Sequence, residues 1–282
     1  MDTYCLLNNE YKKTSEPLLK VNDLGLLRGY GVFDFFPIQG NHPVFFNDYW
    51  NRFRNSALQM RLPFEWEYDP FMTRLYELMD KNNRADGYCR LLLTGGYTNT
   101  GFLPDGPANF LVITQGPVPY IEENYTRGIK LITMQYTREH PHIKSINYMT
   151  VLLERDRIRN EDATDVLYLS EANITESSRS NFFIIDEKGI LKTPQHDILG
   201  GITRSKVLEL AQDFMEVEVT DLTLEDVKKA RSAFITSTTK GIMPVTKIDD
   251  FSINESQISP VIHQLQKALK DLVNQHLDEL NS

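Results

Sequence analysis

Apolar and polar positions in the first half of the chain change between strand-like and helix-like periods. Residues 31–38 are rich in aromatic and β-branched side chains, and the pattern resumes after Gly40-Asn41, which predicts a β-hairpin. Asp48 is a candidate helix cap, and Asp69-Pro70 combines a cap with a proline at the first helical position. We therefore expect strands over 31–38, 43–46, 88–93 and 110–114, and helices over 48–60 and 69–81.

The second half continues to alternate between the two element types. Ile258, Ile262, Leu265, Leu269 and Leu272 recur near helical spacing, which predicts a long C-terminal helix with one core face. We expect strands over 129–136, 165–169, 182–185, 216–219 and 233–236, and helices over 148–159, 203–214, 224–230 and 258–277. The fold class is therefore α+β.

Two irregular segments suggest the domain organisation. Residues 95–107 are rich in Gly, Pro, Asn and Thr, and are long enough for a lid or binding loop. Gly116-Pro117-Val118-Pro119 is the best boundary, because two prolines and a glycine follow a predicted strand. We expect an N-terminal α/β domain over 1–115, a linker over 116–122 and a C-terminal cofactor-binding domain over 123–282.

Composition and charge narrow the possible partners. The 282 residues are 41% hydrophobic and 24% charged, with a net charge of -9, and the sequence pI is about 5.2. An acidic surface repels nucleic acid and anionic lipid, so neither is an expected partner. Two cysteines make neither a disulfide framework nor a zinc motif, and we expect no metal. The sequence shows no leader pattern or apolar span, which predicts a soluble cytoplasmic protein.

Four segments carry groups suited to chemistry, although each alone has an ordinary interpretation. Residues 198–204 (ILGGITR) join two glycines to a helix start, which can bind an anion or be a simple capped turn. Residues 236–239 are consecutive hydroxyl residues after an apolar strand, which suit an anion or a solvated loop. Glu176 in a polar stretch and Lys144 would each usually be solvated.

In combination and order, these segments resemble the class IV aminotransferases. The matching features are Lys144, Thr175-Glu176 with Asn181, residues 201–204 (GITR), residues 236–238 (TST), and Arg52 before Ser56-Ala57. The resemblance spans about residues 22 to 246. It implies the two-domain class IV aminotransferase fold, with the cofactor between the domains. It also implies a homodimer, in which a loop of the neighbouring subunit, with residues 95–107 as the candidate, completes the pocket.

The resemblance implies that the cofactor is pyridoxal 5'-phosphate and that Lys144 carries it covalently. The amine of Lys144 would then move the proton at the substrate Cα. Glu176 would face the pyridine nitrogen, Leu199 would pack on the ring, and Tyr148 would reach the ring hydroxyl oxygen. The groups implied to hold the phosphate are the Arg52 guanidinium, the Ile202 and Thr203 amides, Ser237 and Thr238.

Departures from the family pattern affect the expected substrate. Tyr49 replaces a usual histidine and Asp34 a usual glutamate, which indicates a pocket unlike those of the familiar subfamilies. Arg28 and Phe33 fall at pocket positions, and Arg90 matches an arginine of branched-chain enzymes. A guanidinium in an apolar pocket needs an anion, so Arg28 and Arg90 predict a carboxylate trap; Arg28 could instead lie at the surface or pair with Asp34.

The trap favours a D-amino acid aminotransferase that uses a 2-oxo acid such as 2-oxoglutarate. An L-branched-chain-amino-acid aminotransferase is the alternative. Aminodeoxychorismate lyase is a third possibility, which the intact segments at 201–204 and 236–239 disfavour.

Overall fold

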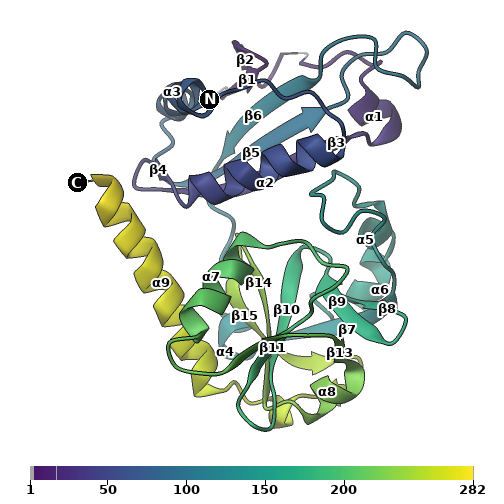
Figure 1. The fold of residues 1–282 in the computed structure, drawn as a ribbon, viewed down its shortest axis with the longest axis vertical. Coiled ribbons are helices and arrows are strands. Elements are labelled where there is room, and N and C mark those ends of the chain that lie inside the picture. Colours follow the sequence, from purple (N-terminus) through teal and green to yellow (C-terminus); the bar gives the residue numbers. More distant parts are fainter. Residues whose placement is uncertain (1–2, 17, 282) are drawn as a thin grey trace. The chain divides into compact units, whose positions relative to one another are not determined.

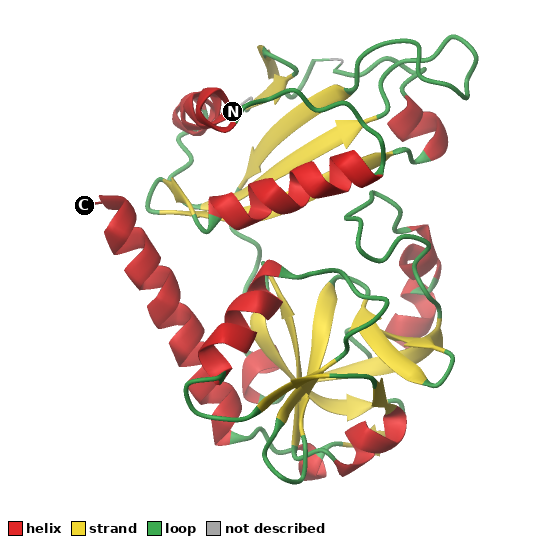
Figure 2. Cartoon of the chain, in the orientation of Figure 1, coloured by secondary structure: helices red, strands yellow, loops and turns green. Residues whose placement is uncertain are grey.

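The computed structural model describes residues 3–16 and 18–281, which form two compact units (Figure 1). The first unit contains the described residues up to Val118, together with Ile143–Asn147 and the residues from Gln275 onward. The second unit contains Pro119–His142 and Tyr148–Asn274. Helices and strands are mixed in both units, which confirms the expected α+β class (Figure 2).

The first unit is built on an antiparallel sheet with the strand order β2-β1-β6-β5-β3-β4. Its strands are β1 (Tyr4–Leu7), β2 (Glu10–Lys13), β3 (Gly31–Gln39), β4 (His42–Pro43), β5 (Gly87–Thr94) and β6 (Asn109–Gln115). Its helices are α1 (Leu24–Arg28), α2 (Phe46–Gln59) and α3 (Tyr68–Lys81).

Aromatic side chains fill the space between the helices and the sheet of the first unit. Phe46 and Trp50 of α2 stack with Phe71 of α3, with ring centroids 5.7 and 4.8 Å apart. Phe71 also meets Phe110 of β6 at 5.7 Å. Offset aromatic contacts of this kind stabilise a core beyond the area that they bury. The core therefore fixes α2 on the sheet, and α2 carries residues of the candidate site.

The strands of the second unit close into a ring. β9 pairs with both β8 and β10, which completes the circuit β10–β14–β15–β7–β8–β9. The strands of this unit are β7 (Ile129–Gln135), β8 (Asp165–Ser170), β9 (Asn173–Ser177), β10 (Ser180–Ile185), β11 (Leu191–Thr193), β12 (Val217–Val219), β13 (Leu222–Thr223), β14 (Ser232–Ser237), β15 (Gly241–Ile248) and β16 (Phe251–Ser252). Its helical segments are α4 (Glu123–Thr126), α5 (Met149–Leu153), α6 (Arg155–Asn160), α7 (Ile202–Ala211), α8 (Leu224–Lys229), a 3-10 turn (Asn254–Ser256) and most of α9 (Pro260–Asn281).

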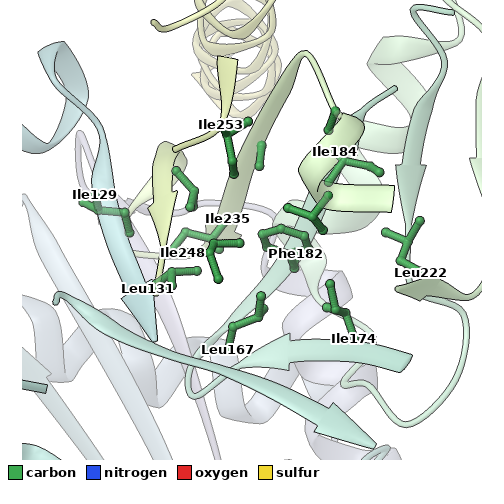
Figure 3. Packing of buried hydrophobic residues seen from close by; sticks show 14 of the residues in the cluster. Ile129, Leu131, Leu167, Ile174, Phe182, Ile184, Leu222, Ile235, Ile248 and Ile253 are labelled. Atoms are coloured by element: carbon green, nitrogen blue, oxygen red, sulfur yellow. The ribbon is translucent and has the colours of Figure 1, made fainter. Parts of the chain in front are cut away.

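Each face of this curved sheet has its own apolar core. Inside the ring, Leu167, Phe182 and Ile235 belong to one buried cluster (Figure 3). On the outer face, Phe183 of β10 and Phe234 of β14 pack with residues of α7 and α9. Successive strand residues point to opposite faces, so β10 and β14 contribute to both cores.

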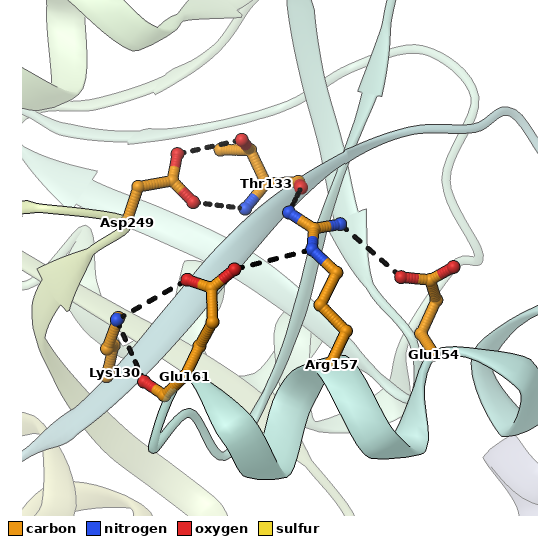
Figure 4. A network of polar contacts seen from close by, with 6 residues as sticks. All are labelled: Lys130, Thr133, Glu154, Arg157, Glu161 and Asp249. Atoms are coloured by element: carbon orange, nitrogen blue, oxygen red, sulfur yellow. Dashed lines mark hydrogen bonds and ion pairs between the residues drawn. The ribbon is translucent and has the colours of Figure 1, made fainter.

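The predicted helix over 148–159 is interrupted in the structure. Glu154 ends α5 and begins α6. Its carboxylate lies 3.4 Å from Arg157 Nη1, and Arg157 Nε lies 3.5 Å from Glu161 (Figure 4). Glu161 in turn pairs with Lys130 of β7 at 3.7 Å. The interruption of the helix at Glu154 is therefore accompanied by contacts between α6 and the sheet. The spacing of apolar residues in the sequence did not predict this interruption.

The interpretation of residues 173–181 as a polar stretch between two apolar strands was wrong. Asn173–Ser177 form β9, and Thr175, Glu176 and Ser177 are buried. The sequence analysis also missed β1, β2, β11, β13, β15, β16, α1, α4 and the 3-10 turn, all of which are short except β15. Among the described residues, no helix is long and apolar enough to cross a membrane.

Candidate active site

Lys144 lies on a short segment that pairs with β3 in the first unit. The Phe33 N–H donates to the Lys144 carbonyl at 2.9 Å, and the Ile146 N–H donates to the Gly31 carbonyl at 3.1 Å. The Lys144 N–H donates to Ser56 Oγ of α2 at 3.2 Å. A Cβ at Gly31 would lie 2.8 Å from the Leu93 carbonyl oxygen and 3.1 Å from Ile146 Cδ1, so a glycine permits this close packing. The backbone of Lys144 is therefore held by a strand and a helix.

The Lys144 ammonium and the Arg90 guanidinium lie against the same aromatic ring. Lys144 Nζ is 4.6 Å from the centroid of Phe33, and Arg90 Cζ is 5.4 Å from it. Arg90 also lies 4.9 Å from the ring of Phe35, its register partner on β3. Cations over aromatic faces are stabilised by the ring quadrupole. Two cationic groups therefore lie near the ring of the predicted pocket residue Phe33.

Arg28 does not lie in an apolar pocket. It is exposed at the end of α1, and its Nε donates to the Gly101 carbonyl at 2.9 Å. Its Nη1 donates to the Leu27 carbonyl at 3.3 Å. The expectation of a buried guanidinium at this position was therefore wrong, and the alternative of a surface residue describes it.

Arg52 of α2 pairs with Asp34 of β3. Its Nε and Nη2 donate to the two Asp34 carboxylate oxygens at 2.9 and 2.6 Å. The Asp34 side chain is fully buried and also accepts the Phe35 N–H at 2.7 Å. This bidentate pair orients the guanidinium. Arg52 and Ser56 are one helical turn apart, so one face of α2 carries both Arg52 and the support of Lys144.

Glu176 is held by a network in the second unit. Its Oε1 accepts Arg138 Nε at 2.8 Å, and its Oε2 accepts the Leu199 N–H at 3.0 Å. Asn181 Nδ2 approaches Oε2 at 3.5 Å and donates to the Leu199 carbonyl at 2.8 Å. The register places Thr236, Asn181 and Glu176 side by side across β14, β10 and β9. The sequence analysis missed Arg138, because nothing in its local pattern indicates a carboxylate partner 38 residues away.

The glycine-rich segment before α7 has the structure expected of an anion site. Gly201 is the N-cap of α7, so Ile202 and Thr203 supply the first helical amides, which have no partner within the helix. A Cβ at Gly201 would lie 2.0 Å from Asn181 Oδ1, so the backbone is packed on the residue that holds Leu199. Burial lowers the pKa of the Arg204 guanidinium, which donates to the Pro194 carbonyl at 3.0 Å.

The hydroxyl segment lies at the end of β14. Ser237 is its last residue and is half-buried, as is Thr238 in the following turn. Thr236 Oγ1 is buried without a hydrogen-bond partner among the described residues. Tyr148 is half-buried at the N-cap of α5.

Helix amides, hydroxyls and a buried carboxylate in one unit fit a phosphate ester of a protonated pyridine, so the residues present suit pyridoxal phosphate.

Comparisons with known proteins agree on the family. The family model "Amino-transferase class IV" matches residues 31–248. A putative branched-chain-amino-acid aminotransferase of Methanocaldococcus jannaschii is 30% identical, over 94% of this chain and 95% of that protein. A D-alanine aminotransferase of Listeria monocytogenes is 28% identical, over 98% of each chain.

Solved structures show the same fold. The branched-chain amino acid aminotransferase of Escherichia coli has a TM-score of 0.89 and 24% identity, over 97% of this chain and 95% of that chain. The T.th. branched-chain amino acid aminotransferase, solved with pyridoxamine 5'-phosphate, has a TM-score of 0.89 and 25% identity, over 98% and 95%. These findings confirm the resemblance to class IV aminotransferases and the fold that the sequence predicted. The chain belongs to the class IV aminotransferases and is a pyridoxal-phosphate-dependent aminotransferase.

Proposed function

We propose that this enzyme transfers the amino group of a D-amino acid to a 2-oxo acid such as 2-oxoglutarate, with Lys144 carrying the cofactor and Arg90 binding a substrate carboxylate. The observation that carries the proposal is the shared position of Lys144 Nζ and Arg90 against the Phe33 ring, at 4.6 and 5.4 Å from its centroid. A carboxylate held by Arg90 would keep the substrate within reach of the lysine.

Each residue in the proposal has a distinct physical task. When bound, the cofactor supplies an electron sink for negative charge at the substrate Cα. Lys144 accepts and returns the proton at that carbon, since its amine lies on a fixed segment beside an apolar ring. Glu176 would accept the pyridine N–H, and Leu199 and Tyr148 would contact the ring face and its hydroxyl oxygen. Arg52, the Ile202 and Thr203 amides, Ser237 and Thr238 would hold the phosphate.

Transamination of L-branched-chain amino acids is the second candidate. The walls beside Arg90 are the rings of Phe33 and Phe35, which suit an aliphatic substrate side chain. The relative from Methanocaldococcus jannaschii carries a putative assignment of that kind. The D-alanine aminotransferases among the relatives support the first candidate. Lyase action on aminodeoxychorismate stays the least favoured, because residues 201–204 and 236–239 are intact.

The test compares D-glutamate, D-alanine, L-leucine and L-valine as donors with 2-oxoglutarate as acceptor. We expect turnover of the D-acids, and Arg90→Leu should raise the KM for the donor by roughly tenfold or more, the cost of losing a charge-assisted contact. Arg54→Leu is the matched control, since Arg54 is an exposed arginine of α2 in the same unit. Fast turnover of L-leucine with little use of any D-acid would exclude the first candidate. An unchanged KM in Arg90→Leu would exclude the trap.

We also propose that the chain works as a homodimer in which the loop 95–107 contacts the neighbouring subunit. Phe102 and Leu103 of this loop expose 73% and 61% of their surface, which is costly for adjacent large apolar residues. Light scattering should give twice the mass of one chain. Replacing both residues by serine should shift the protein toward monomers and lower its activity. A fully active monomer would refute this proposal.

A further inference from the structure

One end of the strand ring in the second unit is closed by polar side chains. Asp165 begins β8, Ser180 begins β10, and Ser177 and Ser237 end β9 and β14. Ser180 has the same parity as Phe182 and Ile184, which belong to the interior apolar cluster, so its side chain points into the ring. The apolar interior therefore ends in a polar layer at the end where the hydroxyl turn follows β14.

Lys240 supplies the cation of this layer. Its Nζ donates to Ser180 Oγ at 3.0 Å and lies 3.8 Å from Asp165 Oδ2. The Asp165 side chain is 4% exposed and that of Lys240 15%. Asp165 Oδ1 already accepts Ser178 Oγ at 2.6 Å and the Val166 N–H at 2.9 Å. The lysine of the turn thus reaches across the end of the ring to strands β8 and β10.

Burial of this charge pair costs desolvation free energy. Burial lowers the pKa of Lys240, and the Asp165 carboxylate partly offsets that effect. Asp165 Oδ2 and Ser177 Oγ are buried without a hydrogen-bond partner in the described part of the chain. Apolar residues of similar volume often stabilise a core at least as well as a buried ion pair. A role in positioning would account for a charged pair at this place.

The backbone of the same lysine is fixed as well. The Lys240 N–H donates to Ser237 Oγ at 3.3 Å, and the Lys240 carbonyl accepts Tyr125 Oη of α4 at 2.8 Å. With the ammonium contacts, the turn after β14 is held from several directions. This turn contains Thr238 and follows Ser237, the two hydroxyl residues assigned above to the cofactor phosphate.

We propose that Lys240 is a positioning residue for the cofactor phosphate: its ammonium, held by Asp165 and Ser180 at the end of the strand ring, fixes the turn that presents Ser237 and Thr238. The inference rests on the proposed phosphate site. Lys240 itself does not bind the phosphate; it sets the geometry of groups that do, so its loss raises the entropy cost of binding at this turn.

The experiment measures dissociation constants of pyridoxal phosphate and of pyridoxal, which lacks the phosphate, for the wild-type protein and Lys240→Met. The matched control is Lys228→Met, since Lys228 is an exposed lysine of the same unit that pairs with Glu225 on the surface. Lys240→Met/Asp165→Asn removes both charges, so it leaves no unpaired carboxylate. Thermal unfolding by circular dichroism verifies the fold of each variant.

Lys240→Met and the double variant should bind pyridoxal phosphate roughly tenfold more weakly, the loss expected for about one hydrogen bond. Their affinity for pyridoxal should stay within about twofold of wild type, and Lys228→Met should change neither constant. Equal losses for both ligands would indicate a merely structural role and overturn the proposal, as would unchanged affinity for pyridoxal phosphate. A wild-type protein that binds no pyridoxal phosphate would instead contradict the proposed function.

Discussion

Arg138 offers a quantitative test of the network around Glu176. The two side chains are 16% and 6% exposed, and Arg138 Nε donates to Glu176 Oε1 at 2.8 Å. Arg138 Nη2 also donates to the Pro141 carbonyl. Replacing Arg138 with Met removes these donors and leaves the buried carboxylate without its guanidinium partner.

The expected loss follows from what remains around the carboxylate. Removing one partner of a buried ion pair typically costs about 3–5 kcal/mol. Here Glu176 keeps the Leu199 N–H at 3.0 Å, and Arg138 is not fully buried, so part of that cost is offset. We expect Arg138→Met to lower the free energy of unfolding by about 2–3 kcal/mol. Glu176→Gln in the same background removes the unpaired charge and should recover more than half of this loss.

Urea unfolding of the cofactor-free protein at pH 7 measures these changes without a contribution from cofactor binding. Arg155→Met is the control, because Arg155 is an exposed arginine of α6 whose pairing with Asp156 at 3.9 Å lies on the surface. It should change the stability by less than about 0.5 kcal/mol. If Arg138→Met behaved like this control, or if the two replacements were additive, Glu176 would not depend on Arg138.

Three further predictions concern the second unit. Phe182→Ala should cost about 3–5 kcal/mol in urea unfolding, because Phe182 is fully buried inside the strand ring; a cost below about 1 kcal/mol would contradict the observed core. Gly201→Ala should destabilise the cofactor-free protein by about 1–3 kcal/mol, since its Cβ would lie 2.0 Å from Asn181 Oδ1. Gly200→Ala, with nothing within 4 Å of its Cβ, should be nearly neutral, and equal effects would refute this packing. Burial raises the pKa of Tyr168 above its ordinary value of 10.0, so the folded state keeps this proton while the unfolded state loses it. Stability should therefore fall as the pH rises above about 10, and Tyr168→Phe should flatten that decline in denaturant titrations at pH 9 to 11; an unchanged slope would count against a buried Tyr168 hydroxyl.

Local signals located many of the longer elements. Asp69-Pro70 predicted a helix over 69–81, and the structure has α3 at Tyr68–Lys81; the N-cap is Glu67, so Asp69 and Pro70 lie inside the first turn. The predicted helix from Asp48 begins earlier, at Phe46, because Phe45 adopts a left-handed backbone conformation at its N-cap, with φ of 52°. The helix propensity of interior residues can be read from the local sequence. The residue at which a helix begins depends also on the conformation of the preceding turn.

Pairing between residues far apart in the sequence determined features that the local sequence pattern did not predict. Glu176 lies among polar residues, so its sequence resembles a loop; β9 forms because it pairs with β8 and β10 and closes the ring. Arg138 lies 38 residues from Glu176, and Lys240 lies 60 residues from Ser180. Arg138 and Lys240 both lie just outside strands, so the pairing of the neighbouring strands brings them to their partners. For Arg28, in contrast, the motif predicted a place in a pocket, whereas its side chain is exposed.

The covalent attachment of the cofactor to Lys144 is the central claim. The most direct measurement reconstitutes the protein with pyridoxal phosphate, reduces it with borohydride and maps the labelled peptide by mass spectrometry. We predict one label per chain, on the peptide that contains Lys144, and no stable label in Lys144→Ala, which should still unfold cooperatively. A label on another lysine, such as Lys240, or no label after reconstitution would contradict the account.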